Sequence, residues 1–133
     1  MTFTQAVKSG FRNYTNGQGR AVRSEYWYWQ LFVVLVSIAV QILEFILSAA
    51  FGLPERHPLF VGMDLAVRFA FFLPNISVTI RRLHDTGRSG WWMFIALTVI
   101  GVIPLVIWLC MRGKPGKNQY GRNPLEPNVE EVF

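Results

Sequence analysis

The chain has 133 residues, of which 52% are hydrophobic and only 16% are charged, and its formal net charge is +5. Soluble domains carry about 25% charged residues, so this composition excludes an ordinary soluble protein and indicates a membrane protein of one domain. The basic residues flank apolar segments, where they orient a chain in a membrane and meet anionic lipid. We therefore expect membrane lipids, and no nucleic acid, as partners.

The first 20 residues predict an amphipathic helix. Apolar side chains recur at helical spacing, with polar and basic residues between them: Phe3, Ala6, Val7, Gly10, Phe11 and Tyr14. A basic polar face opposite aromatic residues is typical of a helix in the membrane interface, and packing on the rest of the domain is the alternative. The glycines of TNGQG, which begins at Thr15, end this helix.

Three apolar segments follow, at about residues 27–51, 59–79 and 91–111. Each has the roughly 20 residues with which a helix crosses about 30 Å of hydrocarbon. The expected fold is therefore an all-α membrane protein with three transmembrane helices, preceded by the amphipathic interfacial helix. In this interpretation residues 1–125 form a single domain and residues 126–133 form a loose tail. A long polar segment precedes the first span, so that span is not a cleavable signal peptide.

Charged residues interrupt the first two spans. Glu44 lies seven residues before the end of the first span, and Asp64 and Arg68 lie five and nine residues into the second. At about 1.5 Å per residue these depths match across an antiparallel hairpin. We therefore predict an intramembrane polar cluster of Glu44, Asp64 and Arg68, with Gln41 one turn further in, that faces the interior of the bundle. Charges at this depth usually mark function. The alternatives are mutual neutralisation that fixes the register of the hairpin, and an Asp64 close enough to the membrane interface to stay hydrated.

The third apolar segment has two possible topologies, because Gly101 and Pro104 lie near its middle. A single crossing leaves seven Lys and Arg residues on the side of the amino end and five on the other side. A re-entrant hairpin gives eleven against one, a better fit to the positive-inside rule. However, each arm would span only about 15 Å, and the turn would need polar partners inside the membrane. We keep three crossings as the expected topology and leave the orientation open.

The sequence IRRLHDTGRSGWW, residues 80–92, places three arginines, a histidine and an aspartate between two spans. In either topology it shares one side of the membrane with GRAVRSEYWYW, residues 19–29. We expect the two segments to meet and to bind an anionic lipid headgroup or an acidic partner through Arg20, Arg23, Arg81, Arg82, His84 and Arg88. Glu25, Asp85 and Ser89 are the expected structural partners, with Asp85 in a local turn and Ser89 as a helix cap. A purely structural junction is the alternative.

We expect no catalytic, cofactor-binding or metal-binding residues. His84 and Asp85 are adjacent, and the other histidine, His57, is expected on the opposite side of the membrane, which disfavours a metal site. Ser89, His84 and Asp85 are the residue types of a hydrolase, but their linear spacing does not show that they converge. The single cysteine, Cys110, permits no intrachain disulfide.

Four motifs carry a resemblance to a known family. GRAVRSEYWYW before a span, RRLHDTGRSGWW between spans, IP inside the last span and KPGKNQYGRNP after it resemble the YhaH-like bacterial membrane proteins, known as domain of unknown function 805. The match covers nearly the whole chain in the right order. The resemblance implies a multi-pass protein of the bacterial inner membrane with no established reaction, and it supplies no catalytic residues. The cluster of Glu44, Asp64 and Arg68 is not part of these motifs.

The leading interpretation is a non-enzymatic inner-membrane protein whose basic junction binds anionic lipid headgroups or an acidic partner. One alternative is a subunit of a small oligomeric transporter or channel that uses the intramembrane cluster. Three spans are few for a transporter monomer, so a second copy or another membrane protein is then the expected partner. The other alternative is an enzyme at the membrane surface that uses His84 and Asp85.

Overall fold

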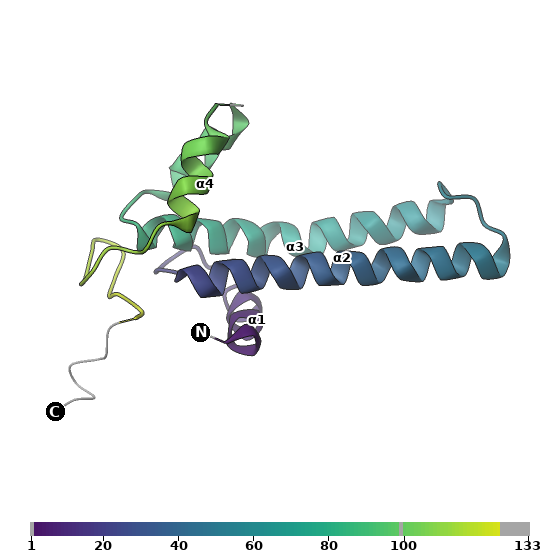
Figure 1. Ribbon diagram of the computed structural model, residues 1–133, viewed down its shortest axis with the longest axis horizontal. Coiled ribbons are helices and arrows are strands. Elements are labelled where there is room, and N and C mark those ends of the chain that lie inside the picture. Colours follow the sequence, from purple (N-terminus) through teal and green to yellow (C-terminus); the bar gives the residue numbers. More distant parts are fainter. Residues whose placement is uncertain (1, 99, 126–133) are drawn as a thin grey trace.

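The computed structural model describes residues 2–98 and 100–125, and its regular elements in these ranges are helices. In chain order they are α1 (Phe3–Arg12), α2 (Arg23–Phe51), α3 (Pro58–Asp85), the 3-10 helix η1 (Gly90–Leu97) and α4 (Val102–Cys110). Helices α2 and α3 lie side by side as a long hairpin. Near the end where α3 finishes, α1 lies on one side of the hairpin, and η1 and α4 project from the other (Figure 1). The expected all-α class is confirmed, whereas the expected tail, residues 126–133, lies outside the described residues.

Two helices in the described part, α2 and α3, are long and apolar enough to cross a membrane. They have 29 and 28 residues, so at about 1.5 Å per residue each exceeds a hydrocarbon core of about 30 Å. Helix α2 ends at Gly52, whose left-handed backbone (φ 65°) is free of strain in glycine. Helix α3 begins at Pro58. A backbone N–H at the first position of a helix has no acceptor within the helix, so the absence of this group in proline costs no hydrogen bond. The short connection between these two residues makes the helices antiparallel.

The third apolar segment, residues 91–111, does not form a third long helix. It is divided between η1 and α4, which fold back on each other, and the rings of Trp92 and Trp108 meet edge to face with centroids 5.6 Å apart. The chain returns to the end of α3, where Arg82 Nε donates to Leu109 O at 3.0 Å. The structure therefore has the folded-back arrangement that the sequence left as the alternative, and three transmembrane helices are not confirmed.

The turn between η1 and α4 depends on Thr98 and Gly101. The Thr98 hydroxyl accepts a hydrogen bond from Gly101 N at 3.1 Å and donates one to Ile95 O at 2.8 Å. These bonds give polar partners to backbone groups within an apolar segment, as a chain reversal in a membrane requires. A side chain at Gly101 would collide with the Ile95 carbonyl oxygen, so this close approach requires glycine.

The expected amphipathic helix is confirmed as α1, and its apolar face packs on α2. Thr2 and Gln5 form a capping box at its start, and Ala6 and Gly10 are buried. Gly10 lies so close to the indole of Trp29 that a side chain at this position would collide with the ring. Edge-to-face contacts complete the interface and involve the rings of Phe3, Phe11, Tyr28, Trp29 and Phe32. Of the two alternatives for this helix, packing on the domain is therefore observed directly.

Pro74 lies inside α3 and changes the hydrogen bonding of the turn before it. Because proline has no N–H, the carbonyl group of Ala70 loses its helical donor. The Tyr14 hydroxyl donates to this carbonyl instead, and Ser77 Oγ donates to Tyr14 O at 3.1 Å. The segment after α1 is thereby attached to the middle of α3.

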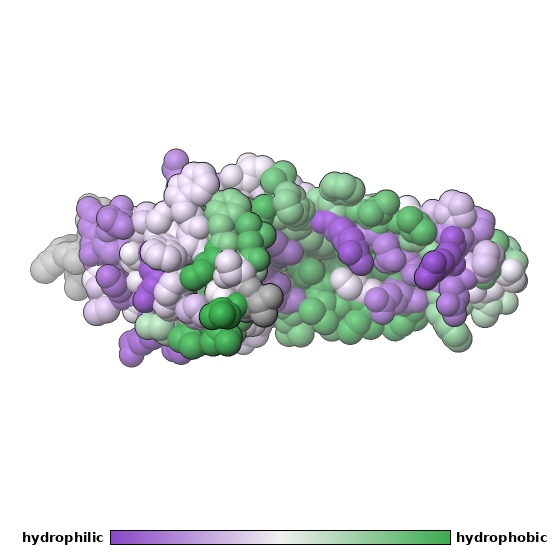
Figure 2. Space-filling model, turned by 90° about the horizontal axis from the view of Figure 1, so that it is seen from above, coloured by the Kyte–Doolittle hydropathy of each residue, from purple (hydrophilic) through white to green (hydrophobic). Residues whose placement is uncertain are grey.

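The buried core lies at the end of the hairpin where α1, η1 and α4 gather. Its members are Ala21, Tyr26, Trp29, Phe71, Val78, Leu83, Leu105 and Leu109. The other half of the hairpin exposes large apolar side chains, among them Ile42, Phe45 and Phe69, as helices that face lipid do. Figure 2, seen from the side from which η1 and α4 project, shows hydrophobic residues along the hairpin with a hydrophilic patch at its middle.

Candidate functional site

Two arginines and an aspartate form a buried network of ion pairs at the end of the hairpin. Arg20 Nε lies 2.9 Å from Asp85 Oδ1, and Arg82 Nη1 lies 2.6 Å from Asp85 Oδ2. The side chains of Arg20, Arg82 and Asp85 are 1%, 0% and 2% exposed. Buried charges are tolerated when they are paired and hydrogen-bonded. This network, which we call the arginine clasp, therefore needs partners for its remaining nitrogen atoms.

Backbone carbonyl groups supply these partners. The two guanidinium groups donate to carbonyls of the segment before α2 and of the chain at and after the end of α4, namely those of Ala21, Leu109, Met111, Lys114, Gly116 and Gly121. Hydrogen bonds from a charged donor are stronger than neutral ones. The clasp therefore holds three separate segments of the chain together, because each guanidinium bridges at least two of them.

Gly113 and Lys114 bring the chain after α4 against the clasp. Lys114 N donates to Asp85 O at 2.8 Å. A side chain at position 113 would collide with the Asp85 carboxylate, so the absence of a Cβ at Gly113 is what allows this approach. Asp85 was expected to form a local turn with the residues after it, whereas its carboxylate binds two arginines from different segments.

A second buried ion pair joins α1, α2 and α3. Arg81 Nη1 lies 2.6 Å from Glu25 Oε1, and the Ser9 hydroxyl donates to the same oxygen at 2.5 Å. The side chains of Arg81 and Glu25 are 4% and 5% exposed. Ala21 N also donates to Arg81 O at 2.9 Å. Arg81 Nε and Nη2 are buried without a hydrogen-bond partner among the described residues, so the pair is less completely satisfied than the clasp.

His84 and Arg88 contact aromatic rings at the same end. The imidazole of His84 stacks on Tyr120, with ring centroids 3.8 Å apart and an interplanar angle of 2°, and its Nδ1 lies 2.9 Å from Gly19 O. The guanidinium of Arg88 lies 4.4 Å from the centre of the Trp108 ring, a cation–π distance. Both side chains therefore fasten neighbouring segments of this protein.

The structure brings together most of the basic residues that the sequence singled out, together with Glu25 and Asp85. Arg23 is exposed and lines a shallow depression with Trp27. Ser89 is the N-cap of η1, and its hydroxyl accepts from Trp91 N at 3.4 Å. The described contacts of the buried arginines are with other parts of the chain, which is the geometry of a structural junction.

Sequence reasoning missed the part that the chain after α4 contributes to this site. The carbonyl acceptors after α4 lie between residues 111 and 121, and the Asn118 amide donates to His84 O at 2.9 Å. Every residue has a backbone carbonyl group, so a sequence does not show which of these groups accept hydrogen bonds from arginine. The available signal was the motif KPGKNQYGRNP, whose glycines and prolines indicate an ordered turn.

The candidate chemistries can be compared with this geometry. A hydrolase arrangement needs His84 to contact a nucleophile and an acid, but its Nδ1 lies against Gly19 O and Asp85 binds Arg20 and Arg82. Within residues 2–98 and 100–125, no group of three or more His, Cys, Asp or Glu side chains is placed to hold a metal ion.

The predicted intramembrane cluster is only partly assembled. Gln41, Asp64 and Arg68 line one small hollow between α2 and α3, but Asp64 and Arg68 are exposed and do not face a bundle interior. Glu44 is half-buried, and its Oε1 is covered without a hydrogen-bond partner among the described residues. The ion pairs within the described ranges join arginines 20, 81 and 82 to Glu25 and Asp85. No described segment packs over Asp64 and Arg68, because η1 and α4 lie near the end of the hairpin where α3 finishes.

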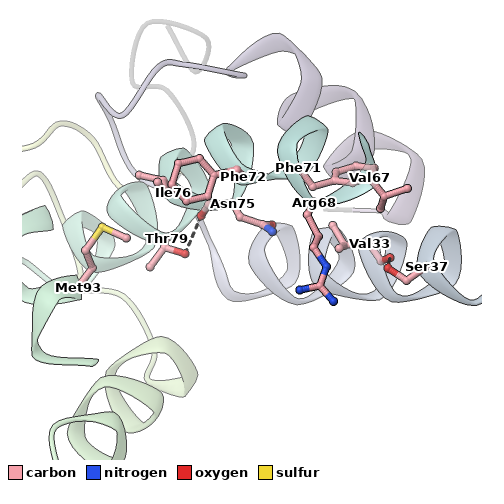
Figure 3. A pocket seen from close by; sticks show the side chains of 10 residues that line it. All are labelled: Val33, Ser37, Val67, Arg68, Phe71, Phe72, Asn75, Ile76, Thr79 and Met93. Atoms are coloured by element: carbon pink, nitrogen blue, oxygen red, sulfur yellow. Dashed lines mark hydrogen bonds between the residues drawn. The ribbon is translucent and has the colours of Figure 1, made fainter. Parts of the chain in front are cut away.

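A cavity of about 340 Å³ extends from this hollow toward η1. Its lining is mostly apolar, and Figure 3 shows Met93 of η1 at one end, Ser37 and Val67 at the other, and Arg68 between them. Asn75, also in the lining, accepts a hydrogen bond from Trp29 Nε1 at 2.8 Å. The cavity therefore connects the hollow at Arg68 with η1 through a mostly apolar lining.

Comparison with known proteins gives a consistent result. A family described as protein of unknown function (DUF805) matches residues 14–122. Inner membrane protein YhaI of Escherichia coli (strain K12) is 36% identical over 117 residues, which cover 87% of this chain and 92% of that protein. Inner membrane protein YhaH of the same strain is 34% identical over 118 residues, covering 87% and 93%. The uncharacterized protein YiiR is 31% identical over 121 residues, covering 84% and 67%. No solved structure matches the chain significantly.

Proposed function

The chain belongs to the DUF805 family and is a protein of the bacterial inner membrane, and we propose that its clasp end binds anionic lipid headgroups without catalysing a reaction. The exposed cations that surround the clasp, rather than the buried arginines within it, make these contacts. The observation that carries the proposal is the distribution of basic residues in the folded-back arrangement. Eleven Lys and Arg residues flank the clasp end, and Arg56 alone flanks the other end of the hairpin.

The exposed cations come from several segments that meet at this end. They include Lys8, Arg12, Arg23, Arg112, Lys114, Lys117 and Arg122. A basic residue near an anionic membrane surface contributes about 1 kcal/mol of attraction, so a group of seven can retain anionic lipid without a preformed pocket. By the positive-inside rule this end faces the cytoplasm.

Burial separates the two groups of basic residues. Arg20 and Arg82 already bind Asp85 and backbone carbonyls, and their side chains are at most 1% exposed. Transferring either guanidinium to a lipid phosphate would break its buried ion pair with Asp85, which costs several kcal/mol. The exposed cations have no such penalty. We therefore assign the clasp a structural part, which sets the positions of the cations around it.

Lipid retention measured by native mass spectrometry tests the proposal. The protein is released from nanodiscs that contain equal amounts of phosphatidylglycerol and phosphatidylcholine, and the bound lipids are counted. We expect a preference for phosphatidylglycerol that a combined Arg12→Gln, Arg23→Gln, Arg112→Gln and Lys117→Gln variant loses. Arg56→Gln, at the other end of the hairpin, is the control and should retain the preference. An unchanged preference in the fourfold variant would contradict the proposal.

A further inference from the structure

The middle of the hairpin carries a polar stripe on the face from which η1 and α4 project. We define it by Ser37, Gln41 and Glu44 of α2 together with Asp64 and Arg68 of α3. The α2 residues follow one another at spacings of four and three, which places them on one helix face, and Ser37, Gln41, Asp64 and Arg68 line a common hollow. Figure 2 shows hydrophilic residues here, with hydrophobic residues around them.

The depth of the stripe makes its exposure costly in a membrane. Arg68 lies ten residues from the start of α3 and seventeen from its end, or about 15 and 26 Å at 1.5 Å per residue. Within the apolar segment, residues 59–79, Arg68 is nine residues from one end and eleven from the other, or about 14 and 17 Å, so it lies near the middle of the hydrocarbon core. Charged side chains at such depth face a protein interior or a water-filled cavity and pair with one another. Asp64 and Arg68 are exposed and form no ion pair among the described residues.

The composition of the stripe identifies what covers it. A small anion would neutralise Arg68 and leave Asp64 unpaired, and a lipid tail would pair with neither. A second copy of this chain offers both charges. When two copies are related by a two-fold axis along the membrane normal, the same residues meet at the same depth. Asp64 and Arg68 lie one turn apart, about 6 Å along the helix, so the acid of one copy can reach the base of the other.

We propose that the protein forms a homodimer in the membrane through the polar stripe, with Arg68 of each copy paired to Asp64 of the other. Exposed apolar side chains beside the stripe, Leu65 and Phe72 among them, pack around the two ion pairs. Gln41 supplies a further donor and acceptor at the same depth. The dimer completes an interior that the two-helix hairpin lacks, because η1 and α4 cover only the clasp end.

The test uses two charge reversals, each of which is expected to weaken association of two copies alone and to restore it when the two variants are combined. Arg68→Asp places acids at both positions 64 and 68, and Asp64→Arg places arginines at both, so at these positions a homodimer of either variant meets like charges. We expect pull-down between differently tagged copies to fall by at least about tenfold for each variant alone. Coexpression of an Arg68→Asp copy with an Asp64→Arg copy should restore it. An ion pair within one copy gives the same two losses but no recovery, so failure to recover overturns the proposal.

A crosslinking measurement in native membranes keeps the proposal testable if the reversals prevent folding. In a Cys110→Ser background, Phe72→Cys places a thiol beside the stripe, and Ala66→Cys places one on a different, exposed face of α3. A bifunctional maleimide should link two copies through position 72 at least about fivefold more efficiently than through position 66. At about 100° per residue, position 72 lies within about 80° of both Asp64 and Arg68 around the helix, whereas position 66 lies about 160° from each. Equal crosslinking from both positions would contradict a dimer through the stripe.

Discussion

The arginine clasp and the polar stripe both place an arginine and an aspartate on α3, yet the surroundings of these residues differ. In the clasp, Arg20 and Arg82 bind Asp85 and are at most 1% exposed. In the stripe, Asp64 and Arg68 are exposed and have no ion pair among the described residues. The difference arises from packing: other segments of the chain pack over the clasp, whereas no segment within residues 2–98 and 100–125 packs over Asp64 and Arg68. Residue type alone therefore does not show whether a charged side chain is buried and paired within the fold or exposed to a binding partner.

The cover of the clasp depends on the folded-back course of η1 and α4. Because α4 returns to the end of α3, the carbonyls of Leu109, Met111 and Lys114 reach the two guanidinium groups. A third crossing of about 30 Å would carry these carbonyls to the other end of the hairpin and leave buried arginines without acceptors. The clasp and the folded-back segment therefore stabilise each other, and the same fold leaves the stripe uncovered.

The largest effect is expected from neutralising the acid of the clasp. Asp85→Asn leaves Arg20 and Arg82 buried without a counter-charge, and breaking a buried ion pair in this way costs about 3–5 kcal/mol. Thermal unfolding of the purified protein in mild detergent should show a large fall in Tm. Glu55→Gln, in the exposed loop between α2 and α3, is the control. A Tm of the Asp85 variant within 2 °C of the control would show that the clasp is not a stabilising network.

A smaller loss is expected when the chain after α4 is pushed away from the clasp. Gly113→Ala introduces a Cβ that collides with the Asp85 carboxylate, and such overpacking typically costs about 1–3 kcal/mol. Gly62→Ala is a matched control, because a Cβ at Gly62 meets only open space and alanine favours a helix over glycine by about 1 kcal/mol. The two variants should shift Tm in opposite directions. A neutral or stabilising effect of Gly113→Ala would mean that the backbone at Gly113 does not pack tightly against the Asp85 carboxylate.

The Tyr14 contact at Pro74 allows a double-mutant cycle. Tyr14→Phe removes the hydroxyl that donates to Ala70 O, and we expect a loss of about 1 kcal/mol in the free energy of unfolding. Pro74→Ala restores an N–H that can bond to the same carbonyl, so Tyr14→Phe should matter less in that background. Denaturant unfolding of the four proteins measures the coupling. Equal effects of Tyr14→Phe in both backgrounds would show that the Tyr14 hydroxyl and Pro74 are not energetically coupled.

The smallest effect on the fold is expected from Arg68→Gln. Because Arg68 has no hydrogen bond or ion pair among the described residues, unfolding of the monomer should change by less than about 0.5 kcal/mol. Arg82→Gln, which removes a clasp guanidinium, should be far more destabilising under the same conditions. The comparison is made in detergent at a concentration where light scattering shows a monomer. Equal destabilisation by the two substitutions would erase the distinction between clasp and stripe.

Much of the fold could be predicted because it depends on local patterns. The helical spacing from Phe3 to Tyr14 predicted α1, and two apolar segments predicted α2 and α3. The motif IRRLHDTGRSGWW indicated a junction of helix ends that would meet residues 19–29, as Arg81 and Glu25 do. The course of residues 91–111 could not be settled, since a continuous apolar segment is compatible with one crossing or two short arms, and Gly101 and Pro104 permit both.

By itself, the sequence determined the membrane class, the helical hairpin and the family, because composition, periodicity and motifs follow directly from the order of the side chains. The end at which the basic residues gather depended on the folded-back course of the third apolar segment. Only the tertiary structure decided which of those charges are internal. Burial of Arg20 and Arg82 depends on backbone carbonyls from residues 109–121, and no side-chain pattern encodes these contacts. The acceptors of Arg20 at Gly116 and Gly121 lie 96 and 101 positions away in the chain. Arg68 is exposed because η1 and α4 lie near the end of α3 and do not pack over the middle of the hairpin. The role of a charged side chain in a membrane protein depends on which segments pack over it, and that packing is set by the whole fold.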